Sequence, residues 1–157
     1  MNLNLREKHA YTYGAGSGFA MRHAAGPFIA GGAIVTKATA PAIREILGEI
    51  ERLRTEPVGE GELAEAKANL IQQLPARFET ASDTAGSLSY LAIHGLPLDE
   101  YATRPKRFAR VTREQIQAAA RRYLVPERMR VGVVGDAAAI KDDLAGLGLG
   151  QPVIKKP

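Results

Sequence analysis

The sequence predicts an α+β fold, in which several helices pack against a small antiparallel sheet. Three observations predict it: a glycine-rich opening with strand-like alternation, apolar stripes at helical spacing from residue 39 onward, and a short apolar run over residues 129–134. The 157 residues are 45% hydrophobic and 24% charged, so the chain can bury a core of ordinary size. Only two or three strands are expected for many helices, which suggests that part of the sheet is missing.

Residues 11–35 are predicted to form two antiparallel strands. Tyr11–Tyr13 and Phe19–Met21 alternate with small or polar residues, and Phe28–Val35 is a second apolar run. The dipeptide Gly26-Pro27 lies between the two runs and is typical of a turn. The many glycines leave one face of these strands shallow, which suits close approach by a helix or by an extended peptide, the helix being the commoner case.

The middle of the chain is predicted to be helical. Apolar stripes predict one helix over residues 39–53, ending before Pro57, and a second over residues 60–74, ending at Pro75. A third helix is expected to be capped by Ser82 or Asp83 and to end at Gly95. Residues 98–108 are expected to form a shorter helical piece that is broken at Pro105.

The strongest local signal is the capping box of Thr112 and Gln115, which starts a helix that runs to Leu124. Val111 and Ile116 supply the accompanying hydrophobic staple. Residues 129–134 are then predicted to form a short buried strand, and Asp136 to cap a last helix that ends at Leu144. The remaining residues are expected to be a loose tail.

The composition excludes several classes of site. The absence of cysteine removes disulfides, thiolate zinc sites, iron–sulfur clusters and cysteine nucleophiles. The three histidines, His9, His23 and His94, do not have the spacing of a zinc-binding helix. No apolar run is long enough to cross a bilayer, and the first residues do not resemble a signal peptide. We therefore expect no complete catalytic set and no metal site in this chain.

A basic stretch covers residues 100–130, with nine Lys or Arg against three Asp or Glu. We interpret it as solvated helix faces. A nucleic-acid-binding helical module over residues 104–130 is an alternative that we do not favour, because Tyr101, Phe108 and Tyr123 are too few for a stacking surface.

Arg6 and Tyr13 flank the start of the first predicted strand and could both donate hydrogen bonds to a carbonyl or carboxylate. The segment Leu5-Arg-Glu-Lys-His-Ala-Tyr-Thr-Tyr13 resembles the Leu-Arg-Glu-x-x-Gly-x-x-Tyr segment of the pitrilysin/insulinase (M16) family of zinc metallopeptidases, to which the processing peptidases belong. Further similar features follow in order, from Pro57-Val58 through Phe78-Glu79-Thr80 and Gly95-Leu-Pro97 to Val133-Val134-Gly135-Asp136. The resemblance covers about residues 2–148.

The resemblance implies half of a clamshell peptidase fold. In that family two α+β halves enclose a peptide chamber: the first half carries zinc, and the second, inactive half supplies an Arg and a Tyr seven residues apart to the substrate. Arg6 and Tyr13 match that spacing, so they are the substrate-binding candidates. Ala10 stands where the family usually has glycine. The strands and helix that precede this segment in the family are absent, which implies a truncated C-terminal domain over residues 1–148 and a tail over 149–157.

From this resemblance we expect a non-catalytic domain of a zinc-dependent peptidase that neither binds zinc tightly nor cleaves peptides by itself. Its partners would be a catalytic half or zinc-bearing subunit and a peptide substrate, and a homo-oligomer stays open. The alternative is a catalytically silent scaffold or binding partner of a separate peptidase subunit. The compartment, cytoplasmic or periplasmic, is left open, as is the identity of the substrate.

Overall fold

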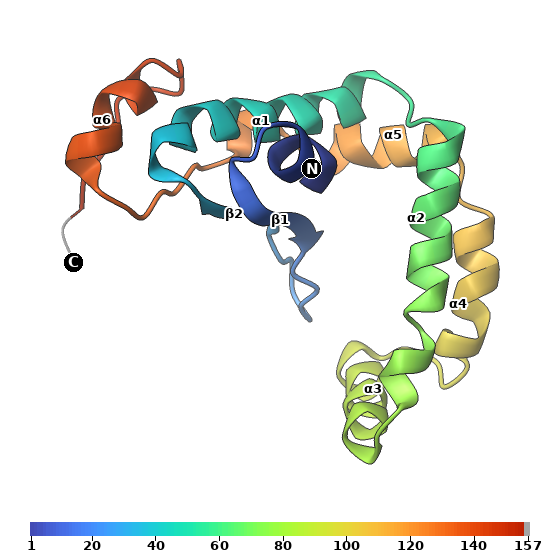
Figure 1. Cartoon of the computed structure of the whole chain (residues 1–157). Coiled ribbons are helices and arrows are strands. Elements are labelled where there is room, and N and C mark those ends of the chain that lie inside the picture. The colour runs from blue at the N-terminus through green and yellow to red at the C-terminus, as the bar shows by residue number, and fades with distance from the viewer. Residues whose placement is uncertain (156–157) are drawn as a thin grey trace. The chain divides into compact units, whose positions relative to one another are not determined.

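The structure is a computed structural model that describes residues 1–155 (Figure 1). Helices and one two-stranded antiparallel sheet make up its regular structure, so the expected α+β class is confirmed. The chain divides into two compact units. Unit 1 contains residues 1–20, 27–52 and 123 onward, and unit 2 contains residues 21–26 and 53–122.

Unit 1 begins with a six-residue π-helical turn, η1 (Leu3–Lys8), followed by the strands β1 (Thr12–Phe19) and β2 (Phe28–Ile34). The strands pair antiparallel from Thr12 opposite Ile34 to Phe19 opposite Phe28, as the alternation predicted. The rings of Phe19 and Phe28 lie 5.1 Å apart, and this aromatic pair closes the far end of the ladder.

A short turn, η2 (Thr36–Ala38), leads into α1 (Thr39–Thr55), whose Pro41 lies in the first turn, where its missing N–H costs little. The core of unit 1 forms between this helix and η1, where Leu5 is fully buried. It is lined by apolar residues from the whole length of the unit: Leu5, Ala38, Ala40, Ala42, Ile43, Ile50, Leu124 and Ile140.

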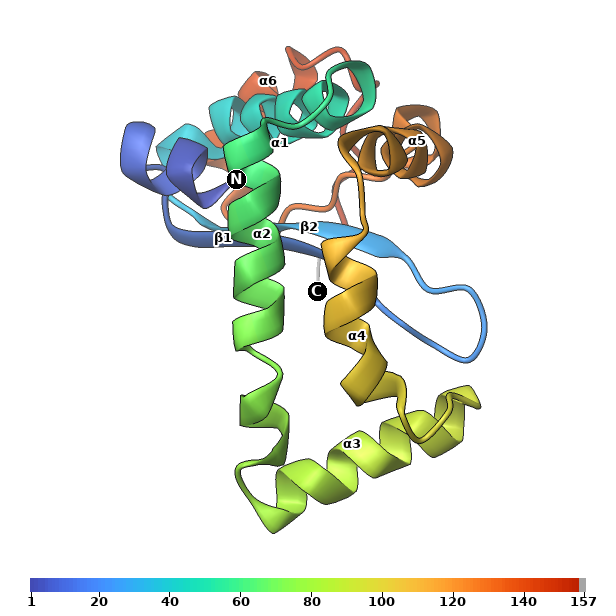
Figure 2. The same ribbon diagram turned by 90° about the vertical axis from the view of Figure 1, so that its right-hand side faces the viewer.

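Unit 2 is helical and contains α2 (Glu60–Gln72), η3 (Pro75–Phe78), α3 (Ala81–His94), α4 (Glu100–Ala109) and most of α5 (Arg113–Tyr123). Figure 2 shows α2 and α4 side by side, and the Lys67 ammonium joins them by donating to the carbonyl oxygen of Ala109 at 3.0 Å. No helix within residues 1–155 is long and apolar enough to cross a membrane.

The third helix begins earlier than we predicted, because Thr80 is its N-cap in place of Ser82 or Asp83. The Thr80 hydroxyl accepts a hydrogen bond from the backbone N–H of Asp83 at 3.1 Å, and the Asp83 carboxylate accepts one from the N–H of Thr80 at 3.2 Å. This reciprocal capping box satisfies two N–H groups at once, which neither predicted cap could do alone. The predicted end at Gly95 is confirmed, since Gly95 adopts a left-handed φ of 61°.

The predicted break at Pro105 is wrong, because α4 continues through this residue. Proline removes one helical hydrogen bond. Glu100, however, ties the two sides of Pro105 together: its carboxylate lies 2.9 Å from the Arg104 guanidinium and 2.5 Å from that of Arg107. The ion pair between Glu100 and Arg107 joins the helix across the point where the backbone bond is lost.

The C-terminal helices follow the sequence prediction. Gln115 N–H donates to the Thr112 hydroxyl at 3.2 Å and Thr112 N–H donates to the Gln115 side chain at 3.0 Å, which confirms the capping box of α5. After a short 3-10 turn, η4 (Pro126–Arg128), the helix α6 (Ala137–Ala145) begins at Asp136, whose carboxylate accepts from Ala138 N–H at 2.9 Å.

The predicted buried strand at 129–134 is wrong: these residues form no strand, and Val131, Val133 and Val134 are exposed. A strand exists only where a neighbour completes its hydrogen bonds, and no other part of residues 1–155 supplies one here. The tail after α6 has no helix or strand as far as residue 155, and residues 156 and 157 lie outside the described part of the chain.

Candidate functional site

Arg6 lies on η1. The residues that precede Arg6 in the chain fix this turn to the rest of unit 1. The fully buried Leu5 anchors the turn in the core. On its other side, the Asn4 amide donates to the carboxylates of Glu45 at 2.7 Å and Glu49 at 3.0 Å, both on α1. These contacts leave Arg6 outside, and its side chain is 56% exposed.

The Arg6 guanidinium is available for a ligand. Its ion pair is with Glu7, at 3.4 Å, and the Glu7 side chain is itself 62% exposed. An ion pair between two such exposed side chains contributes little stability, at most about 1 kcal/mol. A carboxylate or carbonyl of a bound peptide could therefore replace Glu7 at small cost.

A left-handed turn connects η1 to β1. Ala10 has a φ of 53°, and no other non-glycine residue among the described ones has a positive φ. The N–H of Tyr11 donates to the carbonyl oxygen of Leu5 at 2.8 Å, which ends η1 and turns the chain into the strand. The resemblance places glycine at this position, and the observed φ gives the physical reason, because glycine adopts this conformation without steric cost.

Tyr13 follows directly on β1 and is 97% exposed. The residue before it, Thr12, points inward and is buried, with its hydroxyl 2.6 Å from the carbonyl oxygen of Ala33 on β2. The same hydroxyl accepts a hydrogen bond from Gly14 N–H at 3.0 Å. Thr12 thus fixes the backbone on both sides of Tyr13 and directs the phenol to the surface.

The register of β1 against β2 explains why the side chain of Tyr13 is exposed. Thr12 is opposite Ile34, but Ala15 is opposite Gly32, so β1 contains one more residue than β2 between these pairs. Such a bulge bends the strand and changes the direction of a side chain. It also requires Gly32, because a β-carbon there would lie 2.4 Å from the carbonyl oxygen of Gly14.

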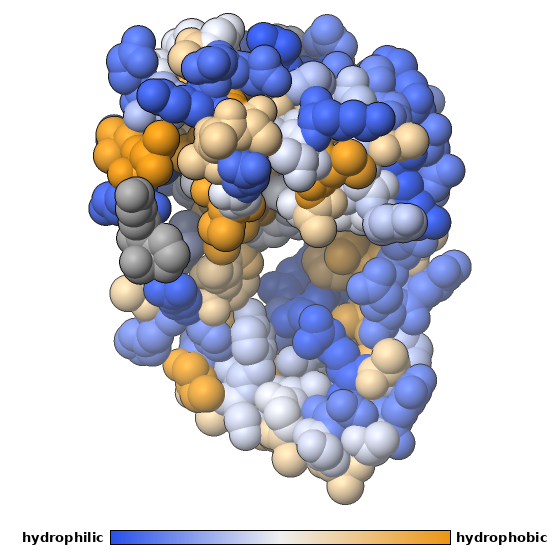
Figure 3. All heavy atoms as spheres, turned by 60° about the vertical axis from the view of Figure 1, so that its left-hand side comes forward, coloured by the Kyte–Doolittle hydropathy of each residue, from blue (hydrophilic) through white to orange (hydrophobic). Residues whose placement is uncertain are grey.

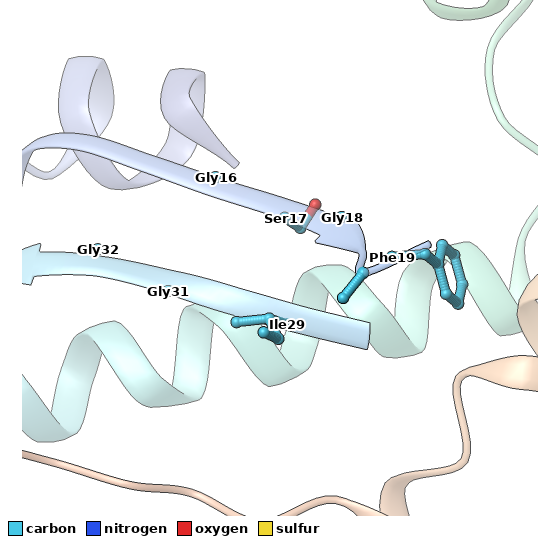
Figure 4. A pocket seen from close by; sticks show the side chains of 8 residues that line it. Gly16, Ser17, Gly18, Phe19, Ile29, Gly31 and Gly32 are labelled. Carbon is cyan, nitrogen blue, oxygen red and sulfur yellow. The ribbon is translucent and has the colours of Figure 1, made fainter. Parts of the chain in front are cut away.

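Beyond Tyr13 the hairpin forms a shallow, open hollow of about 560 Å³. Figure 4 shows that Phe19, Ile29 and the small Ser17 contribute side chains to it, while the glycines of both strands contribute none. The hollow is lined by Gly16, Ser17, Gly18, Phe19, Ala20, Ile29, Gly31 and Gly32. Such a surface lets another backbone approach closely, as the glycine pattern predicted.

Residues 1–155 contain no group of three or more His, Cys, Asp or Glu side chains that could hold a metal ion. His9 lies on unit 1 with Nε2 3.8 Å from a Glu45 carboxylate oxygen, and the ring of His94 is 4.3 Å from that of Tyr90 in unit 2. The described residues therefore offer no ligand set for a zinc ion.

Several cations of the basic stretch are already engaged within unit 2. Arg104 and Arg107 pair with Glu100, while Arg113 donates to the carbonyl oxygen of Val58 and Arg121 to that of Arg54. Part of the positive charge in the basic stretch is therefore used in contacts within unit 2.

The site contains residues that sequence reasoning did not select, namely Asn4, Thr12 and Gly32. For Gly32, adjacent glycines within a strand were a signal of close backbone approach. Asn4 gave no signal, because its partners are 41 and 45 residues away in the chain.

The family model of the peptidase M16 inactive domain matches residues 1–70, which include Arg6, Tyr13 and the whole hairpin. Over this segment, which is less than half of the chain, the chain is similar to the peptidase M16 inactive domain. The M16 relationship that the sequence predicted is thereby confirmed. No curated protein matches the chain.

Two solved structures share the fold of this chain. One is the crystal structure of a peptidase M16 inactive domain from Pseudomonas fluorescens, with a TM-score of 0.68, and the other is a protease from Helicobacter pylori, with a TM-score of 0.62. Both are 24% identical to this chain over 78% of its residues. This chain spans only 29% and 30%, respectively, of these two chains.

Proposed function

We propose that this chain is an M16 inactive domain, the C-terminal, non-catalytic part of a zinc-dependent peptidase, and that it closes the chamber in which the peptide is held. The zinc site would lie on another half of the polypeptide or on a partner subunit, where zinc would polarise the scissile carbonyl and activate water. In this proposal residues 1–148 are the domain and residues 149–157 a tail.

The observation that carries the proposal is the presentation of Arg6 and Tyr13. Both lie in the segment that the family model matches, and both are exposed on a backbone held by Asn4 and Thr12. A rigid backbone below an exposed donor is what transition-state stabilisation needs, because the donor then requires no reorganisation.

Tyr13 would donate its O–H to the oxygen of the scissile carbonyl as negative charge develops there. Arg6 would hold a carboxylate or a backbone carbonyl of the same peptide, and so keep it in register. The shallow hairpin beyond Tyr13 would let the extended peptide pass close to the strand backbone.

The test is steady-state kinetics of the native peptidase, isolated with its zinc-bearing part from the source cells. Tyr13→Phe should lower kcat about 100- to 1,000-fold with little change in KM, as expected for one lost oxyanion donor. Arg6→Ala should act mainly on KM. The matched controls are Tyr90→Phe, a tyrosine of unit 2, and Lys8→Ala, an exposed cation two residues from Arg6. Full activity of Tyr13→Phe would reject the proposed role.

A second candidate is a silent scaffold that binds a separate peptidase subunit. It is equally compatible with the description of the matched family as an inactive domain. The same variants decide between the two, because a scaffold would retain the partner and its activity after both substitutions.

A further inference from the structure

We infer that Glu45, on α1, is a positioning residue of the proposed site: its carboxylate holds η1 at both ends and thereby fixes the direction in which Arg6 points. The inference rests on the proposed function in taking Arg6 as the group that binds the peptide. Whether Glu45 holds the turn can be measured in the chain itself, without reference to activity.

The two oxygens of the Glu45 carboxylate contact opposite ends of η1. Oε2 accepts a hydrogen bond from the Asn4 amide at 2.7 Å, and Oε1 lies 3.8 Å from Nε2 of His9, the residue that follows the last one of the turn. Arg6 is two residues after Asn4 and three residues before His9. One carboxylate therefore holds the turn on both sides of Arg6, and it resists a rotation of η1 that a single contact would permit.

His9 is well placed to keep this contact. Its side chain is 25% exposed, and its Nε2 atom is shielded from solvent and makes no hydrogen bond with any described residue. The imidazolium, or the tautomer with its proton on Nε2, can donate to the Glu45 oxygen, which satisfies a group that is costly to leave unpaired. The His9 ring also stacks on that of Tyr11, with the centroids 4.9 Å apart and the planes inclined by 18°. Because Tyr11 directly precedes β1, the hold on η1 continues to the strand that carries Tyr13.

Polar contacts have to supply this hold, because apolar packing supplies little of it. Leu5 is the only buried residue of η1, and Leu3 in the same turn is 79% exposed. Figure 3, which brings the α6 side forward, likewise shows apolar side chains at the surface among hydrophilic ones. A helical turn of six residues is also too short to be stable without tertiary contacts. The orientation of η1 consequently depends on the contacts that Asn4 and His9 make with α1.

Glu49, one turn later on α1, is the matched comparison for Glu45. Its Oε1 accepts from the same Asn4 amide at 3.0 Å, but its Oε2 lies 3.5 Å from Arg52 on its own helix. Glu49 thus holds η1 at the Asn4 end, whereas Glu45 holds it at both ends. Comparing the two carboxylates separates the effect of the second contact, at His9, from the loss of one acceptor for Asn4.

The first test is amide hydrogen exchange on the full 157-residue chain. The amides of His9, Ala10 and Tyr11 donate to carbonyl oxygens of residues 4–6 at 2.8–3.1 Å, so their exchange reports the opening of the turn. Glu45→Ala should accelerate this exchange about 10-fold, while Glu49→Ala should have a smaller effect and the amides of α5 should not change in either variant. Equal effects of the two substitutions, or equal acceleration in α5, would overturn the inference.

The second test is steady-state kinetics of the native peptidase, isolated with its zinc-bearing part. Glu45→Ala should raise KM about 10-fold with little change in kcat, because a misdirected Arg6 holds the peptide less well. In an Arg6→Ala background the same substitution should have no further effect on KM, since Glu45 acts through Arg6. A merely structural role would lower kcat and would persist in that background, and this result would overturn the inference.

The two tests distinguish failure of this inference from failure of the proposed function. If Arg6→Ala leaves KM unchanged, the proposed role of Arg6 is rejected, and the exchange of the η1 amides still decides whether Glu45 holds the turn. If Arg6→Ala raises KM and Glu45→Ala does not, the proposed function stands and Glu45 is not its positioning residue.

Discussion

The carbonyl oxygen of Gly14 occupies the space where a side chain of Gly32 would begin, 2.4 Å from the position of a β-carbon. The same β-carbon would lie 3.1 Å from the Cα of Ala15. Both obstructing atoms belong to the backbone, so a rotamer change cannot relieve the contact. The bulge that presents Tyr13 and the glycine on the facing strand therefore depend on each other.

Gly32→Ala should lower the free energy of unfolding by about 1–3 kcal/mol, as expected for overpacking against fixed backbone. Denaturation by urea measures the change. Gly31→Ala is the matched control, because a β-carbon at that position would meet nothing within 4 Å. Equal effects of the two substitutions would mean that the bulge does not restrict position 32.

Ala10→Gly should raise the free energy of unfolding by about 0.5–1 kcal/mol. The left-handed conformation costs alanine about 1–2 kcal/mol, which glycine would avoid. The greater conformational freedom of glycine in the unfolded chain offsets only part of this stabilisation. Ala24→Gly, at a position without positive φ, should be neutral or slightly destabilising. Thermal unfolding of the two variants makes the comparison, and a loss of stability in Ala10→Gly would contradict this explanation.

Thr80→Ala should destabilise the chain by about 1 kcal/mol, the usual cost of losing an N-cap side chain. Ser82→Ala, two residues later in the first turn of α3, should change stability by less than about 0.5 kcal/mol. Urea denaturation followed by circular dichroism tests both. A larger loss of stability in Ser82→Ala than in Thr80→Ala would indicate that Ser82 is the N-cap, as the sequence predicted.

Glu100 should make unit 2 sensitive to acid. The hydrogen bond from Arg107 holds the pKa of its carboxyl below the ordinary value of 4.5, against the opposing effect of burial and with further help from Arg104. Because the pKa is lowered in the folded state, the stabilisation is fully present above pH 4.5 and is lost as the pH falls toward the lowered value.

Glu100→Gln should therefore cost about 1–3 kcal/mol at pH 7, as for hydrogen bonds to charged groups, and progressively less as the pH falls below 4.5 toward the lowered pKa. Unfolding by urea at several pH values measures this dependence. Glu65→Gln, which neutralises an exposed carboxylate on α2, is the matched control for the loss of one negative charge. A difference between Glu100→Gln and the parent chain that does not change with pH would contradict the ion-pair explanation.

Local signals in the sequence determined most of the helices, both strands and the M16 relationship. The capping box at Thr112, the glycine end of α3 at Gly95 and the alternation on both sides of Gly26-Pro27 act over a few residues, so the sequence alone specifies them. Arg6 and Tyr13 were selected through the resemblance of their segment to that family, and their functional role remains a proposal.

Only the tertiary structure decided the features that depend on distant partners. Asn4 meets its two carboxylates across more than forty residues, and the bulge at Tyr13 needs the facing Gly32. Residues 129–134 have the composition of a strand and still form none, because backbone hydrogen bonds require a neighbour that local sequence cannot supply. Periodicity and capping are properties of adjacent residues, whereas register, burial and strand pairing are properties of the surfaces that meet.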